Sequence, residues 1–210
     1  MHRRSLWLLV LNLSLFLFIV WAWNTEQTFL SMLDEWGMNA ITAQGESNFT
    51  RVARFFSAFS SYAICLGFGF ILSFAFLYLK KYWVSALVLI GAAGTRLISS
   101  TLKNLFGRNR PPLDSLITTH GDAFPSGHVI YAVFLSGALF LFITCRYRSM
   151  NRFLFLLCGI LFIALVGWSR VHLGAHYISD VLGGLFIGAI WLQAIWILAL
   201  IKNSPDSAGA

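Results

Sequence analysis

Six long apolar runs restrict what this chain of 210 residues can fold into. A helix crosses the hydrocarbon core of a bilayer, about 30 Å thick, with about 20 apolar residues, and about 17 suffice. The runs cover residues 5–23, 61–79, 82–102, 129–145, 153–169 and 181–201. Because 58% of the residues are hydrophobic and only 11% are charged, the composition is not that of a soluble domain. We predict an all-α polytopic membrane protein, a single domain over residues 1–202 with six transmembrane helices.

The loops on the two sides of these spans differ in charge. Seven of the eight acidic residues lie on one side. The other side holds Arg3, Arg4, Lys80, Lys81, Arg146, Arg148, Arg152 and Lys202. Basic residues favour the cytoplasmic side. We therefore predict a multi-pass protein of a bacterial inner (plasma) membrane, with both termini cytoplasmic and the acidic side facing the periplasm.

The two ends of the chain carry weaker signals. The first run follows two arginines, as a signal peptide would, but it ends in Trp21-Ala22-Trp23. This aromatic belt is typical of a membrane interface and not of a cleavage site, so we interpret the run as a retained anchor. Residues 203–210 are small and polar, and we predict a short disordered tail.

Residues 24–60 form the one long stretch without a predicted span. Phe29, Leu33 and Trp36 follow one another there at helical spacing, which is typical of a helix lying in the membrane interface. A packed loop is the alternative, and the pattern does not decide between them.

Several function classes find no support in the composition. Cys65, Cys145 and Cys158 fall inside or beside apolar runs, so they form neither a disulfide framework nor a spaced metal site. The net charge of +7 comes from scattered loop residues without a continuous basic face, which argues against nucleic acid as a partner. We predict no metal and no cofactor.

Two polar segments, residues 103–128 and 169–180, lie far apart in the sequence. The first follows the third span and the second follows the fifth, so two crossings separate them. Both must therefore emerge on the same face of the membrane, whichever way the protein is oriented. Ionisable groups at a membrane edge are costly to place and usually mark a functional site.

The two segments carry more positive than negative charge. Their basic residues are Lys103, Arg108, Arg110 and Arg170, and their acidic residues are Asp114, Asp122 and Asp180. Arginine forks and a lysine ammonium suit a phosphate group. Ser126 and Gly127 add a hydroxyl and backbone N–H groups at the expected start of a helix, where an anion is stabilised. The surplus charge predicts a phosphate-binding site.

Two histidines add catalytic potential to this site. His176 precedes Asp180 by four residues, so an imidazole and a carboxylate can pair within one helical turn. His176 is the candidate nucleophile that would form a phosphohistidine. His128, from the other segment, is the candidate acid that protonates the leaving group and later activates water. One histidine and one carboxylate fall short of a metal site.

These residues resemble the three-part signature of the type 2 phosphatidic acid phosphatase (PAP2) superfamily, which also includes vanadium haloperoxidases and bacterial acid phosphatases. The first part is Lys103 with Arg110-Pro111, the second is Pro-Ser-Gly-His at residues 125–128, and the third is Ser169-Arg170, His176 and Asp180. All three parts are complete and in order, and the resemblance covers roughly residues 96–188. The six predicted spans agree with the membrane-bound branch.

The resemblance implies a PAP2-like helical bundle with its catalytic signature over residues 103–180. It implies that Lys103, Arg110, Ser126, Gly127 and Arg170 bind phosphate, that His176 attacks, that Asp180 orients it, and that His128 is the acid. The expected function is a metal-independent phosphatase for a membrane lipid phosphate or pyrophosphate, such as undecaprenyl pyrophosphate or phosphatidylglycerophosphate. A lipid phosphotransferase, a haloperoxidase and a non-catalytic lipid phosphate carrier are the alternatives.

A few polar residues lie outside the signature. We predict Arg108, His120 and His172 to be solvated loop residues, with a second phosphate as the alternative for Arg108. Arg96 lies seven residues before Lys103, on the same helical face and about 10 Å deeper along the axis. It either binds a lipid headgroup or pairs internally.

Overall fold

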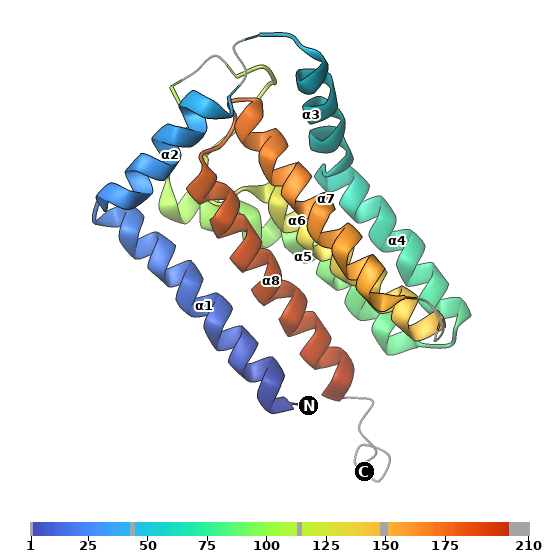
Figure 1. Cartoon of the computed structure of the whole chain (residues 1–210). Coiled ribbons are helices and arrows are strands. Elements are labelled where there is room, and N and C mark those ends of the chain that lie inside the picture. The colour runs from blue at the N-terminus through green and yellow to red at the C-terminus, as the bar shows by residue number, and fades with distance from the viewer. Residues whose placement is uncertain (1, 43–44, 113–114, 148–150, 202–210) are drawn as a thin grey trace.

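The computed structural model describes residues 2–42, 45–112, 115–147 and 151–201. Within these ranges the chain forms eight helices and no strand (Figure 1). The helices are α1 (His2–Asn24), α2 (Thr28–Ala40), α3 (Asn48–Phe59), α4 (Tyr62–Tyr78), α5 (Tyr82–Phe106), α6 (Gly127–Arg146), α7 (Arg152–His172) and α8 (Ile178–Ile201). The tail predicted for residues 203–210 lies outside the described residues.

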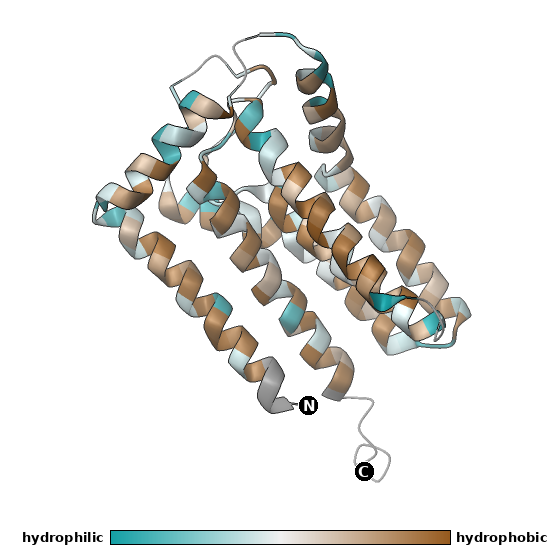
Figure 2. Ribbon diagram, in the orientation of Figure 1, coloured by the Kyte–Doolittle hydropathy of each residue, from teal (hydrophilic) through white to brown (hydrophobic). Residues whose placement is uncertain are grey.

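The described residues hold five candidate spans, and six, as predicted, if α3 and α4 together form one span. Helices α1, α5, α6, α7 and α8 are each long and apolar enough to cross a membrane. Helix α4 has only 17 residues, and it passes the same test only together with α3, to which it is joined by a bend of 50°. Hydrophobic residues cover most of the length of these helices (Figure 2). The all-α prediction is confirmed within the described residues, and the predicted second span corresponds to this bent pair of helices.

Glycines allow the central helices to approach one another closely. A Cβ atom at Gly184 of α8 would lie 2.6 Å from the carbonyl oxygen of Ser126, and one at Gly188 would lie 2.9 Å from Cβ of Val133 on α6. Only glycine fits at such distances. Gly184 and Gly188, four residues apart in the last apolar run, therefore mark close packing of α8 against α6.

The region between the first two spans is helical. Of the two alternatives for residues 24–60, the helix is confirmed as α2, and a second helix, α3, follows it. Phe29 and Trp36 of α2 are exposed, whereas Leu30 and Asp34 on another face are buried. The apolar stripe seen in the sequence thus points away from the protein, as expected for a helix at a membrane interface.

The two signature segments lie at the same end of the bundle. In Figure 1 the first turn of α1 and the last turn of α8 share the opposite end. The backbone N–H of Ser126 donates to the carbonyl oxygen of Asp180 at 3.0 Å, which joins the two segments directly. Counting crossings in the sequence therefore predicted correctly that they meet.

Candidate active site

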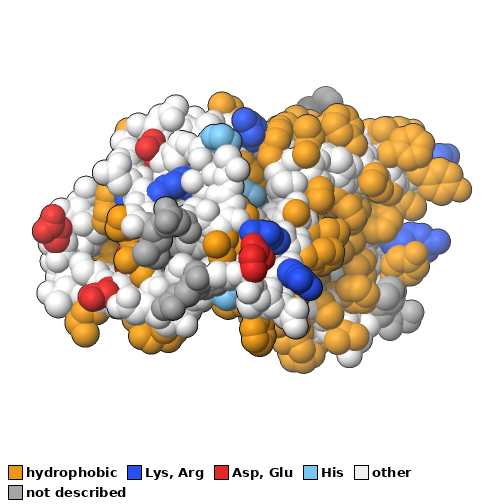
Figure 3. Space-filling model, turned by 90° about the horizontal axis from the view of Figure 1, so that it is seen from above, with side chains coloured by type: hydrophobic (Ala, Val, Ile, Leu, Met, Phe, Trp, Pro, Cys, Tyr) orange, Lys and Arg blue, Asp and Glu red, His pale blue; other side chains and the backbone are white. Residues whose placement is uncertain are grey.

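A cavity of about 380 Å³ lies where the two segments meet. Six of the eight predicted site residues line it: Lys103, Arg110, Gly127, His128, Arg170 and His176. The other two, Ser126 and Asp180, are fully buried beside it. Viewed from this end of the molecule, charged and histidine side chains lie over the polar part of the surface next to a hydrophobic flank (Figure 3).

Helix ends and tight turns position these side chains. Helix α5 ends at Phe106 and places Lys103 in its last turn; Gly107, which caps the helix, has a φ of +58° that suits glycine. Helix α7 carries Arg170 in its last turn. Gly174, with φ of +69°, then turns the chain toward α8 and brings His176 to the cavity. Because glycine adopts positive φ without steric strain, both turns are compatible with the sequence.

His176 and Asp180 form the predicted pair. Nδ1 of His176 lies 3.4 Å from Oδ2 of Asp180, and this oxygen also accepts the backbone N–H of Tyr177 at 2.9 Å. Because an ionised carboxylate can only accept, the proton of the ring belongs on Nδ1 and the lone pair on Nε2. Burial, together with Arg170, Lys103 and Arg110, holds the pKa of His176 well below its ordinary value. The imidazole is therefore neutral and can act as a nucleophile at neutral pH.

The cations are held by backbone and hydroxyl oxygens. Lys103 donates to the carbonyl oxygen of Asp122. Arg110 donates to the carbonyl oxygens of Gly121 and Ala175 at 2.8 Å each, which fixes the chain next to His176. These contacts place the positive charges around one cavity.

Two buried polar groups at the site have no partner. Among the described residues, Nε of Arg170 and Oγ of Ser126 are buried without any hydrogen bond. Another nitrogen of Arg170 donates to the hydroxyl of Ser57 on α3. Unsatisfied buried polar groups are rare in proteins, and a missing ligand is one explanation. An anion in the cavity, which Arg170 lines and Ser126 adjoins, is such a ligand.

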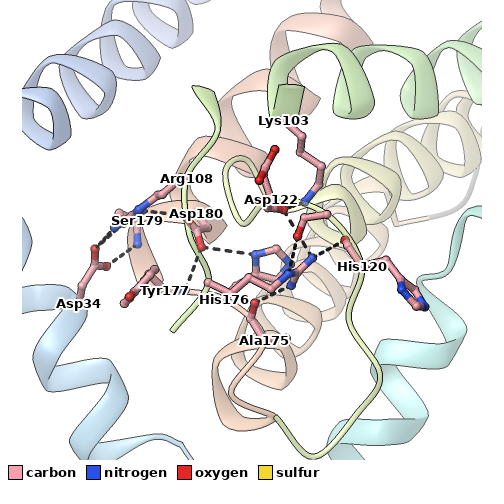
Figure 4. A network of polar contacts seen from close by, with 12 residues as sticks. Asp34, Lys103, Arg108, His120, Asp122, Ala175, His176, Tyr177, Ser179 and Asp180 are labelled. Carbon is pink, nitrogen blue, oxygen red and sulfur yellow. Dashed lines mark hydrogen bonds and ion pairs between the residues drawn. The ribbon is translucent and has the colours of Figure 1, made fainter. Parts of the chain in front are cut away.

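The prediction that Arg108 is a solvated loop residue is wrong. Its guanidinium is buried and forms ion pairs with Asp180 at 2.6 Å and with Asp34 of α2 at 2.8 Å (Figure 4). It also donates to the hydroxyl of Ser179 at 2.6 Å. Sequence reasoning missed Asp34 and Ser179, because neither belongs to a recognisable motif.

The predictions for the other three residues outside the signature, His120, His172 and Arg96, differ in how they compare with the structure. His120 is exposed, as predicted. His172 is half-buried, and its Nδ1 lies 2.8 Å from the carbonyl oxygen of Ile41, so the prediction of a solvated residue is wrong. Arg96 lies over the ring of Tyr62 at 5.2 Å and lines the same cavity as Lys103. Within the described residues it forms no ion pair.

The side chains present do not assemble a metal site in the described part of the chain. No group of three or more His, Cys, Asp or Glu side chains there is placed to hold a metal ion. The cations and hydrogen-bond donors around the cavity can stabilise a phosphate without one.

Comparisons with known proteins agree with this geometry. Phosphatidylglycerophosphatase B of Bacillus subtilis (strain 168) is 31% identical over 114 residues, which are 53% of this chain and 56% of that protein. The putative undecaprenyl-diphosphatase YbjG of Escherichia coli (strain K12) is 32% identical over 117 residues, 52% and 55% of the two chains. Lipid A 1-phosphatase of Rhizobium johnstonii is 32% identical over 142 residues, 59% and 53%. The matches thus span little more than half the length of these relatives.

A solved structure has the same fold. It is described as the crystal structure of the first transmembrane PAP2 type phosphatidylglycerolphosphate phosphatase from Bacillus subtilis. The TM-score is 0.79 at 24% identity, with 91% of this chain and 96% of that chain covered.

The family model for the PAP2 superfamily matches residues 81–203, which include all three signature parts. Because this match extends over more than half of a multi-pass helical chain whose signature residues surround one cavity, the chain belongs to the PAP2 superfamily.

Proposed function

We propose that this protein is a metal-independent lipid phosphate or pyrophosphate phosphatase that works through a phosphohistidine at the outer face of a bacterial inner membrane. One observation carries the proposal: His176, paired with Asp180, lines a cavity next to the buried, unsatisfied hydrogen-bonding groups of Arg170 and Ser126. The names of the relatives support lipid phosphates as the substrate class.

The reaction has two steps. Nε2 of His176 attacks phosphorus, and the bond from phosphorus to the lipid oxygen breaks while His128 gives that oxygen a proton. A water molecule then gives a proton to His128 and attacks the phosphohistidine, which releases inorganic phosphate and restores His176. Lys103, Arg110 and Arg170 stabilise the charge of the transferring group throughout.

The hydroxyl of Ser126 and the backbone N–H of Gly127 complete the phosphate cradle. Gly127 is the first residue of α6, so the positive end of the helix dipole favours an anion there. The hydrophobic flank beside the site (Figure 3) suits a substrate whose acyl or prenyl chain stays in the bilayer. With the site outside, both termini are cytoplasmic.

The proposed function predicts that phosphate release survives chelation. We expect turnover of phosphatidylglycerophosphate and undecaprenyl pyrophosphate in detergent to stay within about twofold of its starting value in EDTA, since the cradle uses cations of the protein. Released phosphate measures the rate. Loss of turnover in EDTA that returns with Mg²⁺ would contradict metal independence, and absence of turnover on every lipid phosphate tested would contradict the phosphatase itself.

Arg96 gives a prediction about substrate choice. It lies about 10 Å below Lys103 along α5 and has no ion pair within the described residues, so we expect it to bind a second anionic group deeper in the headgroup. Arg96→Gln should raise KM for phosphatidylglycerophosphate about fivefold. A change of this size corresponds to the loss of one charged hydrogen bond in a partly exposed site. KM for undecaprenyl pyrophosphate, whose phosphates are adjacent, should not change. Equal KM changes for both lipids would contradict this role.

A further inference from the structure

A buried charge network lies behind the His176–Asp180 pair, on the side away from the cavity (Figure 4). Its centre is Arg108, which is not part of the three-part signature. The network ends at Asp34 on α2, outside the segment matched by the family model, residues 81–203. The network consists of Arg108, Asp34, Ser179 and Asp180, and each of these residues is 9% exposed or less. The half-buried rings of Tyr177 and Trp23 flank it.

Arg108 leaves Asp180 little freedom to rotate. Its Nη1 donates to Oδ1 of Asp180 at 2.6 Å, whereas Oδ2 of Asp180 accepts from Tyr177 N–H and faces Nδ1 of His176. The guanidinium is itself stacked, 4.4 Å from the ring centre of Tyr177 and 5.3 Å from that of Trp23. Because the planar fork of arginine has a fixed geometry, holding Oδ1 also sets the direction of Oδ2.

Asp34 in turn holds Arg108. Its Oδ2 accepts from Nη2 of Arg108 at 2.8 Å and from the hydroxyl of Ser179 at 2.6 Å. Its Oδ1 accepts the backbone N–H of Ser179 at 2.9 Å. Asp34 of α2 therefore binds Ser179, the residue directly before Asp180, through both of its carboxylate oxygens. It also binds Arg108, which contacts Asp180.

Charge balance explains why both partners are needed. The network holds two carboxylates and one guanidinium, and each carboxylate contacts the same cation. A buried pair is costly to break because the remaining group stays charged and unpaired. A neutral side chain at position 34 would remove one of the two ion pairs of Arg108, and the guanidinium would then be held by Asp180, the Ser179 hydroxyl and the two flanking rings, and so less strictly positioned.

We propose that Arg108 and Asp34 are positioning residues that orient the Asp180 carboxylate, and through it His176, for attack on phosphorus. The inference rests on the proposed function of His176. It gives α2 a role in catalysis: the interfacial helix that exposes Phe29 and Trp36 supplies the outer anchor of the catalytic pair.

The test compares Asp34→Asn with wild type, and Glu35→Gln, an exposed acid on the same helix, is the control. Turnover of phosphatidylglycerophosphate in detergent micelles gives kcat and KM, and inorganic phosphate as product inhibitor gives the affinity of the cradle. We expect Asp34→Asn to lower kcat by about tenfold to about a hundredfold, as misplacement of a reacting group does. KM and the inhibition constant of phosphate should stay within about twofold, and Glu35→Gln should match wild type.

Two further measurements separate positioning from a general structural role. When Asp34→Asn is added to the Asp180→Asn variant, kcat should fall by less than about twofold relative to Asp180→Asn alone. The reason is that the effects of residues that act as one unit are not additive. The ¹⁵N shifts of the His176 ring should show the proton on Nδ1 in wild type and a mixture of tautomers in Asp34→Asn. If Asp34→Asn loses its cooperative thermal transition, Arg108→Lys takes its place, because lysine keeps the charge but lacks the fork.

The outcomes are distinct. Wild-type kcat in Asp34→Asn, full additivity with Asp180→Asn, or an unchanged tautomer would each overturn the inference. A wild-type protein that releases no phosphate overturns the proposed function instead, and the ¹⁵N spectra then decide the positioning role by themselves.

Discussion

Replacing His176 with alanine is expected to reduce phosphate release by about 10⁴-fold or more, the scale seen when a covalent nucleophile is removed. The reason is that the phosphoryl group then has no acceptor next to the cations. His176 is almost fully buried, with 2% of its side chain exposed, so water would have to take over its attack in a confined space. The cradle of Lys103, Arg110 and Arg170 is intact in the variant, and the inhibition constant of inorganic phosphate should change by less than about threefold.

The measurement is a burst experiment with ³²P-labelled lipid, followed by alkaline and acid quenching. Wild type should show label on the protein that is stable to base and labile to acid, as for a phosphohistidine, and His176→Ala should show none. Glu35→Gln is the control, because this exposed side chain on α2 does not line the cavity, and it should carry the same label as wild type. Label retained in His176→Ala, or turnover close to wild type, would refute the assignment of the nucleophile.

Much of this site could be predicted from the sequence because membrane insertion simplifies the geometry. Long apolar runs give spans, and counting crossings places loops on one side or the other. That is why Lys103, His128 and His176 could be assigned to one surface although they are distant in the chain. The signature spacing then named the residues that line the cavity.

The contacts behind the cavity could not be predicted in this way. Arg108 and Asp34 are 74 residues apart, and no spacing rule links a loop arginine to an acid on an interfacial helix. The spacing of Phe29, Leu33 and Trp36 predicted a helix in residues 24–60. In a membrane protein, however, an apolar face can contact either lipid or protein, so the hydrophobic pattern does not say which face is buried. Leu30, Asp34 and Gly37 form the buried face, which the structure shows and the sequence pattern does not.

The bend between α3 and α4 has a similar explanation. Hydropathy alone placed a complete span at residues 61–79, and α4 indeed covers Tyr62–Tyr78. The short link at Ser60 and Ser61 bends the chain by 50° and sends α3 toward the site. Ser57 of α3 there accepts a hydrogen bond from Arg170. A hydropathy window averages over such a bend and so does not detect it.

Gly184→Ala is expected to have the largest effect among substitutions outside the cavity. The new methyl group would lie 2.6 Å from the carbonyl oxygen of Ser126, an atom of the backbone that cannot rotate away. Overpacking of this kind costs about 1–3 kcal/mol, more than the gain of about 1 kcal/mol in helix propensity. The backbone N–H of the same serine donates to the carbonyl oxygen of Asp180, so a shift would also move the proposed phosphate cradle away from the proposed catalytic pair, His176 and Asp180.

Gly67→Ala is the matched control, because the same methyl group on α4 would meet no atom within 4 Å. Gly67→Ala should raise the free energy of unfolding slightly through helix propensity, whereas Gly184→Ala should lower it by about 1 kcal/mol after the gain in helix propensity is subtracted from the cost of overpacking. Thermal unfolding in detergent, followed by tryptophan fluorescence, gives the comparison, and phosphate release should fall only in Gly184→Ala. Equal stability and activity in the two variants would mean that α6 and α8 can separate without disturbing Ser126, and close glycine packing would then not be what holds the two signature segments together.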